Sequence, residues 1–124
     1  MKKLTFILAF VLSAFIGNFA IAQQGVSKAE LLTTLNNVDD LGYSKEKTSD
    51  LNNFNKNFVD DVYDITGSNK SDEDKIKGLK NLRDNNKDNL LNILGEDGYK
   101  DFKRSMKRQL KPLKRRSKLL KFII

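Results

Sequence analysis

Ten basic residues near the C-terminus are the most distinctive set of chemically active side chains in this sequence. Six lysines follow one another at spacings of 4, 4, 3, 4 and 3, and four arginines flank them. The set comprises Lys103, Arg104, Lys107, Arg108, Lys111, Lys114, Arg115, Arg116, Lys118 and Lys121. On one helix this spacing forms a continuous cationic face opposite apolar residues such as Met106, Leu110 and Leu113. The chemistry that such a face predicts is the binding of anions.

Several partners fit a cationic helical face. A charge run is most often solvated surface, and cations are favourable near a helix C-terminus. The face can instead bind anionic lipid or lipopolysaccharide, attract acidic stretches of unfolded client proteins, or dock on the acidic part of the same chain. Nucleic acid is the least favoured partner, because no aromatic residue lies between Lys103 and Lys121 to stack on bases.

The residue types on which many enzymes depend are missing. The chain has no His, no Cys and no Trp, so it lacks the usual general base, imidazole and thiolate metal ligands, and a thiol nucleophile. Asp60, Asp61 and Asp64 offer carboxylates for Ca²⁺ only if another element supplies further oxygens, and we expect them to be surface residues. We therefore predict a protein that is not an enzyme and that has no cofactor or metal site.

The N-terminal 22 residues have the organisation of a signal peptide. Lys2 and Lys3 precede an almost uninterrupted apolar run over 4–19, and Ala20 to Ala22 provide the small residues of a cleavage site before Gln23. We therefore predict an exported protein, periplasmic or secreted after cleavage near Ala22.

Charge is divided unevenly along the rest of the chain. Residues 23–99 contain 10 basic and 15 acidic residues, whereas from Lys100 onward there are 11 basic residues and a single acidic one. The sequence thus predicts three parts: a cleavable signal peptide over 1–22, a helical-hairpin domain over 23–110 and a basic amphipathic tail over 111–124.

Apolar residues recur at helical spacing, and turn-forming and capping residues separate the first two helical segments. The first segment is expected to begin at a capping box formed by Ser27 and Glu30 and to end at Gly42. The second is expected to be capped by Ser44. Its apolar stripe consists of Leu51, Phe54, Phe58, Val62 and Ile65.

Two further helical segments follow. The third is expected to begin after Ser71 and to close at Gly95, and the fourth to begin near Glu96 and to bend or break near Pro112. The third stripe includes Leu79, Leu82, Leu90 and Leu94, and the fourth includes Tyr99, Phe102, Met106, Leu110 and Leu113. No segment shows the alternation of a strand, so we predict an all-α fold of about four amphipathic helices that form α-hairpins.

Two short segments begin the second and fourth helices with a shared pattern. Tyr43, Ser44 and Lys47, and again Leu94, Gly95 and Gly98, take the Leu, Thr and Gln places of a Leu-Thr-x-x-Gln motif, and only Ser44 keeps the hydroxyl. In these segments, and in the length and polarity of the stretch between them, the chain resembles the Spy/CpxP family of small periplasmic stress proteins. This resemblance implies a cradle of two α-hairpins, an antiparallel homodimer, and binding of unfolded protein without a nucleotide.

Two functions remain open from the sequence. The first is an exported, non-enzymatic binding protein, an ATP-independent envelope chaperone or stress-response protein of Spy-like type. The alternative is a cationic envelope-surface protein that binds anionic lipid or lipopolysaccharide through its C-terminal helix. A small domain without disulfides also gains most from sharing its apolar faces, which favours a homodimer.

Overall fold

The computed structural model describes residues 25–124, so the predicted signal peptide and its cleavage site lie outside the described residues. This part of the chain is helical and contains no strand, which confirms the all-α prediction. The elements are α2 (Lys28–Leu35), the 3-10 helix η1 (Asp39–Leu41), α3 (Lys45–Thr66), α4 (Asp72–Gln109), α5 (Lys111–Arg116) and the 3-10 helix η2 (Lys118–Phe122).

Three serines cap the helices α2, α3 and α4, as the sequence predicts. Ser27 accepts a hydrogen bond from the backbone N–H of Glu30 at 3.1 Å, and Ser44 does the same for Lys47 at 3.1 Å. Ser71 accepts from the backbone N–H of Asp74 at 3.2 Å. Each hydroxyl satisfies a donor that has no partner within its own helix.

The first helix is shorter than predicted, because α2 ends at Leu35 rather than at Gly42. Asparagine is a poor helix former, and the two that follow Leu35 bind other elements instead. Asn36 Oδ1 accepts from Asn55 of α3 at 2.8 Å, and Asn37 Nδ2 donates to Gln109 of α4 at 2.8 Å. Gly42, with φ of 69°, instead caps the 3-10 turn that follows.

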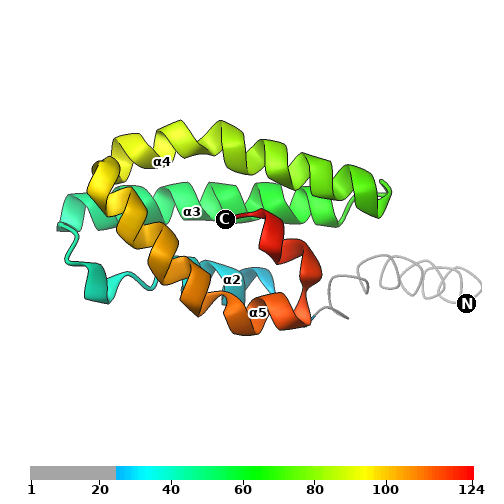
Figure 1. Ribbon diagram of the computed structural model, residues 1–124, viewed down its shortest axis with the longest axis horizontal. Helices are drawn as coiled ribbons and strands as arrows, with labels where there is room; N and C mark the ends of the chain where they lie inside the picture. The colour runs from blue at the N-terminus through cyan, green and yellow to red at the C-terminus, as the bar shows by residue number, and fades with distance from the viewer. Residues whose placement is uncertain (1–24) are drawn as a thin grey trace, which may run out of the picture.

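The long helix α4 consists of two straight halves that meet at Gly95. Gly95 has φ of 76° and ψ of 172°, a conformation that is essentially restricted to glycine. Up to this point α4 runs antiparallel to α3, and after it the chain turns back toward α2 (Figure 1). The prediction that one helix closes at Gly95 and another begins after it is confirmed.

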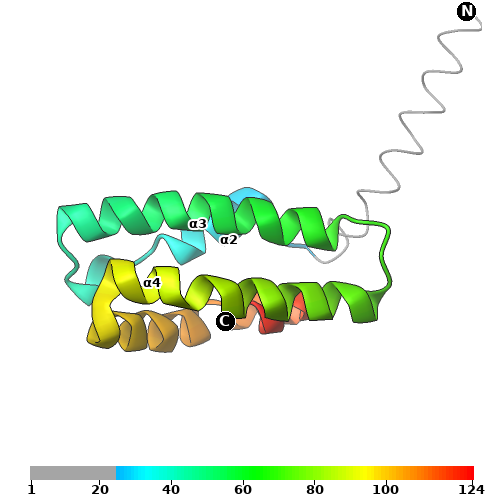
Figure 2. The same cartoon turned by 90° about the horizontal axis from the view of Figure 1, so that it is seen from above.

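The helices form two layers with the core between them. Figure 2 shows α2 and α3 on one side and α4 with the C-terminal segments on the other. The predicted stripes supply the core: Leu51, Phe58 and Val62 come from α3, Leu79, Leu90 and Leu94 from the first half of α4, and Phe102 and Met106 from the second half.

The C-terminal region is not one helix. The α4 helix ends at Gln109, and Pro112 lies in the first turn of α5, where its missing N–H costs no intrahelical hydrogen bond. Ser117 is extended, with φ of −139°, so the chain changes direction again before η2. The predicted break near Pro112 is confirmed, and the basic residues from Lys103 to Lys121 are consequently divided among α4, α5 and η2.

Residues 111–124 pack on the rest of the molecule. Leu113, Leu120 and Ile123 are buried in the same core as α2, α3 and α4. Figure 1 shows the red C-terminal segment turning back toward the middle of the bundle. Among residues 25–124, no helix is both long enough and apolar enough to cross a membrane.

Gly95→Ala tests the constraint at the kink. An alanine in this backbone conformation is strained, so we expect the free energy of unfolding to fall by about 1–3 kcal/mol. Urea denaturation followed by circular dichroism measures the change. The matched control is Gly67→Ala at the end of α3, where φ is −85°; we expect it to change stability by no more than about 0.5 kcal/mol. Equal stability of the two variants would contradict the assigned role of Gly95.

Candidate functional site

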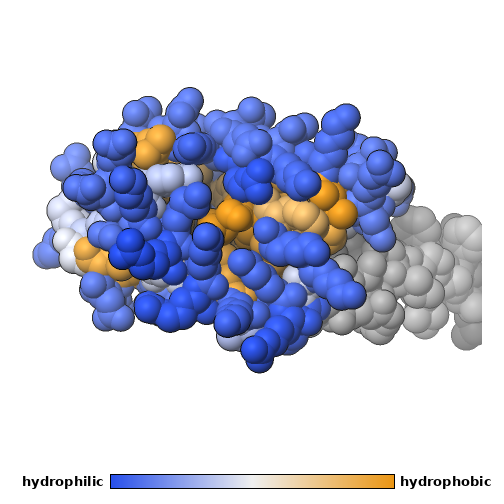
Figure 3. Space-filling view, in the orientation of Figure 1, coloured by the Kyte–Doolittle hydropathy of each residue, from blue (hydrophilic) through white to orange (hydrophobic). Residues whose placement is uncertain are grey.

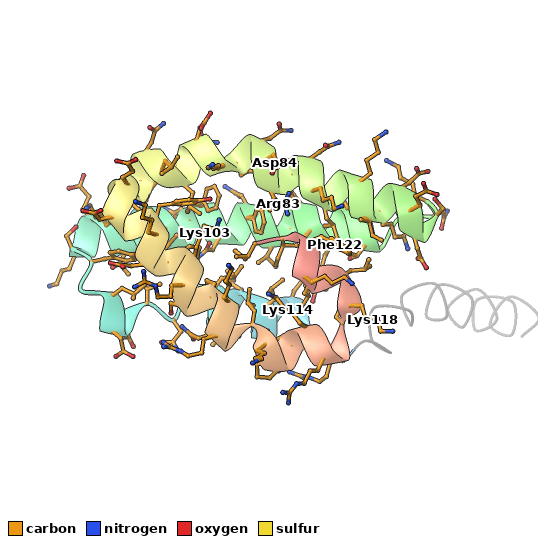
Figure 4. The ribbon with its side chains drawn as sticks, in the orientation of Figure 1. Arg83, Asp84, Lys103, Lys114, Lys118 and Phe122 are labelled. Atoms are coloured by element: carbon orange, nitrogen blue, oxygen red, sulfur yellow. The ribbon has the colours of Figure 1, made fainter. Side chains whose placement is uncertain are left out.

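The structure distributes the ten predicted basic residues over three consecutive elements. Lys103, Arg104, Lys107 and Arg108 lie on α4, Lys111 to Arg116 on α5, and Lys118 and Lys121 on η2. Lys103 and Lys114 are half-buried, and the other eight are exposed. Figure 4 shows Lys103 apart from Lys114 and Lys118. The basic residues therefore do not lie on one helix.

Arg116 has a structural role. One of its guanidinium nitrogens donates to the carbonyl of Gly25 at 2.6 Å, and the other pairs with the Glu30 carboxylate of α2. The hydrogen bond from Arg116 lowers the pKa of Glu30. These contacts fix the end of α5 against the beginning of α2.

A pocket of about 270 Å³ lies where α3, both halves of α4 and the C-terminus meet. In Figure 3, apolar surface gathers near the centre of the side of the molecule that faces the viewer, with hydrophilic side chains around it. The pocket is lined by Leu35, Phe54, Asn55, Phe58, Arg83, Asp84, Asn86, Lys87, Leu90, Tyr99, Phe102, Lys103, Ile123 and Ile124.

Aromatic and aliphatic side chains make up most of the pocket wall. Phe54 and Phe58, one turn apart on α3, are stacked with their ring centroids 5.9 Å apart. Phe102 faces the pocket from the second half of α4, and Ile123 from the C-terminus. Such a wall favours an apolar ligand, because burial of apolar surface is the main attractive term in a pocket of this kind.

All the charged side chains that line the pocket come from α4. Arg83 and Lys87 lie one turn apart on the first half, and Lys103 lies on the second half. Arg83 Nε donates to its neighbour Asp84 at 3.0 Å. The lining thus contains three cationic side chains and one acidic side chain. We refer to Arg83, Asp84, Lys87 and Lys103 as the rim.

Tyr99 connects the rim to the apolar wall. The Lys103 ammonium lies 5.6 Å from the centre of its ring, a cation–π distance. Burial raises the pKa of the Tyr99 hydroxyl, while the charge of Arg83 lowers it and that of Asp84 raises it. Tyr99 therefore shares the electrostatic environment of the rim and remains neutral at physiological pH.

Hydrogen bonds from two side chains, Tyr43 and Asn55, position the walls. The Tyr43 hydroxyl donates to the carbonyl of Gly98 at 2.5 Å, which fixes the start of the second half of α4. A Cβ at Gly98 would lie 3.3 Å from the Tyr43 ring, so glycine permits this close approach. The buried amide of Asn55 donates to the carbonyl of Leu35 at 3.0 Å and to Asn36, which joins α3 to the end of α2.

Of the pocket's charged residues, the sequence singled out only Lys103. Arg83 and Lys87 were missed, although their spacing of one helical turn beside Leu82 and Leu90 was a usable signal. Sequence alone gave no indication that the chain after Gly95 would bring Lys103 opposite them.

The acidic residues Asp60, Asp61 and Asp64 of α3 are exposed and do not line the pocket. Asp60 forms an exposed ion pair with Lys28 at 2.9 Å. Within residues 25–124, no group of three or more His, Cys, Asp or Glu side chains is arranged to hold a metal ion.

No protein-family model matches the sequence, and neither the curated proteins nor the solved structures gave a match.

Tyr43→Phe tests the positioning of the second pocket wall. We expect it to lose about 0.5–1.5 kcal/mol of stability at neutral pH, the usual net value of one hydrogen bond. Burial, aided by the charge of Asp101, raises the pKa of Tyr43 from 10.0 to about 12. Tyr43 therefore stabilises the fold fully below pH 10, and this contribution disappears as the pH rises to 12.

We thus expect the stability difference between wild type and Tyr43→Phe to shrink between pH 10 and pH 12, as measured by urea denaturation. Tyr63→Phe is a parallel test of the same effect away from the pocket, because Tyr63 donates to the Val26 carbonyl at 2.7 Å and burial raises its pKa to about 12. A stability difference between wild type and Tyr43→Phe that stays constant from pH 10 to pH 12 would show that the fold does not raise the pKa of the Tyr43 hydroxyl.

Proposed function

We propose that this protein is an exported, non-enzymatic binding protein that holds ligands with an apolar body and a negative charge. The observation that carries this proposal is the pocket, in which an aromatic wall is bordered by Arg83, Lys87 and Lys103. Burial of an apolar group contributes about 25 cal/mol per Å². The rim adds selectivity, because a cationic ligand would be repelled there.

Unfolded protein segments that combine apolar and acidic residues present this chemistry. The resemblance to the Spy/CpxP family supports such clients, and binding through burial and charge needs no nucleotide. The signal-like residues before Gln23 support action outside the cytoplasm. The protein would then act as an ATP-independent holder of exposed client segments in the cell envelope.

Aggregation of a chemically denatured client protein, followed by light scattering without nucleotide, tests this proposal. We expect the wild-type protein at several-fold molar excess to suppress scattering. The double variant Arg83→Gln/Lys103→Gln removes two rim cations, so we expect it to lose most of this effect.

The matched control is Lys111→Gln/Lys118→Gln, which removes the same charge from exposed positions outside the pocket lining. We expect it to suppress scattering as the wild type does. Unchanged aggregation with the wild-type protein would remove the chaperone function, and equal losses in both variants would show that the pocket is not the site.

The second candidate function is attachment to an anionic lipid or lipopolysaccharide surface. It is favoured by the exposure of Lys111, Arg115, Lys118 and Lys121. Leu113, Leu120 and Ile123 of the same segment are buried in the core, and Leu119, Phe122 and Ile124 are partly buried against it. Little apolar surface is therefore available for insertion into a bilayer. Attachment would therefore be electrostatic and would weaken with salt.

Co-sedimentation with anionic and zwitterionic vesicles measures this attachment. We expect binding to anionic vesicles at low salt, and release at about 0.5 M salt, where the screening length falls well below 10 Å. Each basic residue near the surface adds about 1 kcal/mol, so Lys111→Gln/Lys118→Gln/Lys121→Gln is expected to weaken binding by about 3 kcal/mol.

A variant with the same charge change elsewhere, Lys45→Gln/Lys47→Gln/Lys56→Gln, is the control, since these lysines are exposed on α3. We expect it to bind more tightly than the C-terminal variant. Substitution is preferable to deletion of residues 111–124, because deletion would remove core residues. Equal binding to zwitterionic vesicles, or none to anionic ones, would end this candidate.

A further inference from the structure

We infer that the pocket binds a single-chain anionic amphiphile, with the alkyl chain inside and a carboxylate or phosphate headgroup at the rim. This inference rests on the proposed function insofar as it takes the pocket to be the binding site. It goes further by naming the class of small ligand.

The distribution of polar groups gives the pocket an apolar side and a charged side. No charge is carried by the side chains of Leu35 from α2, Phe54 and Phe58 from α3, and Ile123 near the C-terminus, whereas every charged side chain in the lining belongs to α4. A ligand that matches this arrangement has its charge at one end only. A fatty acid or a single-chain phospholipid has this form.

The size of the pocket supports a single chain. Its volume of about 270 Å³ lies just below the range of roughly 300–1,000 Å³ that is usual for sites that enclose small molecules. Two acyl chains would therefore leave much of their surface in water, whereas one chain of moderate length can lie between Phe58, Leu90 and Phe102.

The rim offers donors of the right kind for the headgroup. Arg83 uses its Nε on Asp84, which leaves its two terminal nitrogens for an oxyanion. A guanidinium fork matches the paired oxygens of a carboxylate or phosphate. Asn86 Nδ2 donates to the Leu82 carbonyl at 2.8 Å, which leaves a second N–H, and Lys87 and Lys103 add two ammonium groups.

The interior suits an alkyl chain, or the apolar side chain of a client segment, better than a peptide backbone. A buried peptide must find a partner for nearly every N–H and C=O group. Asn55 is the polar residue that α3 contributes to the wall, and its amide hydrogens are already used by Leu35 and Asn36. An alkyl chain makes no such demand.

The chain contains no Trp, so a single introduced indole can report on the pocket. In Phe54→Trp the indole replaces a half-buried ring of the pocket wall. We would titrate this variant with dodecanoate, dodecyl phosphate, dodecanol and dodecyltrimethylammonium, each below its micellar concentration. Isothermal titration calorimetry of the wild-type protein with dodecanoate provides a measurement that does not depend on the substitution.

We expect saturable binding of dodecanoate or dodecyl phosphate at least about tenfold tighter than that of dodecanol, since hydrogen bonds to charged groups are the stronger ones. The relative affinity of the two anions distinguishes a carboxylate from a phosphate headgroup. Adding Arg83→Gln/Lys103→Gln to the reporter is expected to abolish the advantage over dodecanol, whereas adding Lys111→Gln/Lys118→Gln is expected to preserve it.

Equal affinity for the anionic, neutral and cationic compounds, or no heat and no fluorescence change with either anion, would overturn the inference. If the wild-type protein still suppressed client aggregation in that case, the proposed function would stand and the ligand class alone would be wrong. If suppression were also absent, the chaperone function would fall as well. Binding of dodecanoate without any suppression would support the amphiphile and remove the protein client.

Discussion

The backbone of Gly95 is the constraint on which the pocket depends. The helix α3 has 22 residues and α4 has 38, so straight helices would measure about 33 Å and about 57 Å. An unbroken α4 would therefore extend about 24 Å beyond its partner, and the side chains of its second half would have nothing to pack on. The turn at Gly95 returns Phe102 and Met106 to the core, where full burial stabilises each by roughly 1.5–3 kcal/mol. The same turn brings Tyr99 and Lys103 to the side of the pocket opposite α3.

The C-terminal residues show how an amphipathic pattern can serve a fold and a surface together. Leu113, Leu120 and Ile123 complete the core, while the neighbouring lysines stay in solvent. Arg116 is shared between these roles, because it is half-exposed and yet bound to Glu30 and Gly25. The ring of Phe122 likewise lies 5.3 Å from the Lys80 ammonium of α4 and 5.1 Å from that of Lys121. A sequence pattern that is typical of a membrane-surface helix thus completes the core of a helical bundle here.

Local signals in the sequence predicted most of the architecture. Serine caps, apolar stripes, Gly95 and Pro112 act within one or two helical turns, so they can be read without knowledge of the fold. The end of α2 was misplaced because Asn36 and Asn37 bind residues of α3 and α4 that are distant in sequence. The pocket was missed for the same reason, since its lining comes from α2, α3, both halves of α4 and the C-terminus. Lys103 was predicted as a binding residue because it belongs to the series of basic residues near the C-terminus. Arg83 and Lys87 line the same pocket as Lys103 only in the folded chain.

We propose that an anionic ligand with an apolar body binds between α3 and the two halves of α4. Intermolecular nuclear Overhauser effects between dodecanoate and the isotope-labelled protein test it most directly. The structure predicts contacts from the chain methyl and methylene groups to Phe58, Leu90 and Phe102, and from the carboxylate end to the Lys103 side chain. Contacts confined to the exposed lysines and Phe122 of η2, with none to the pocket wall, would contradict it.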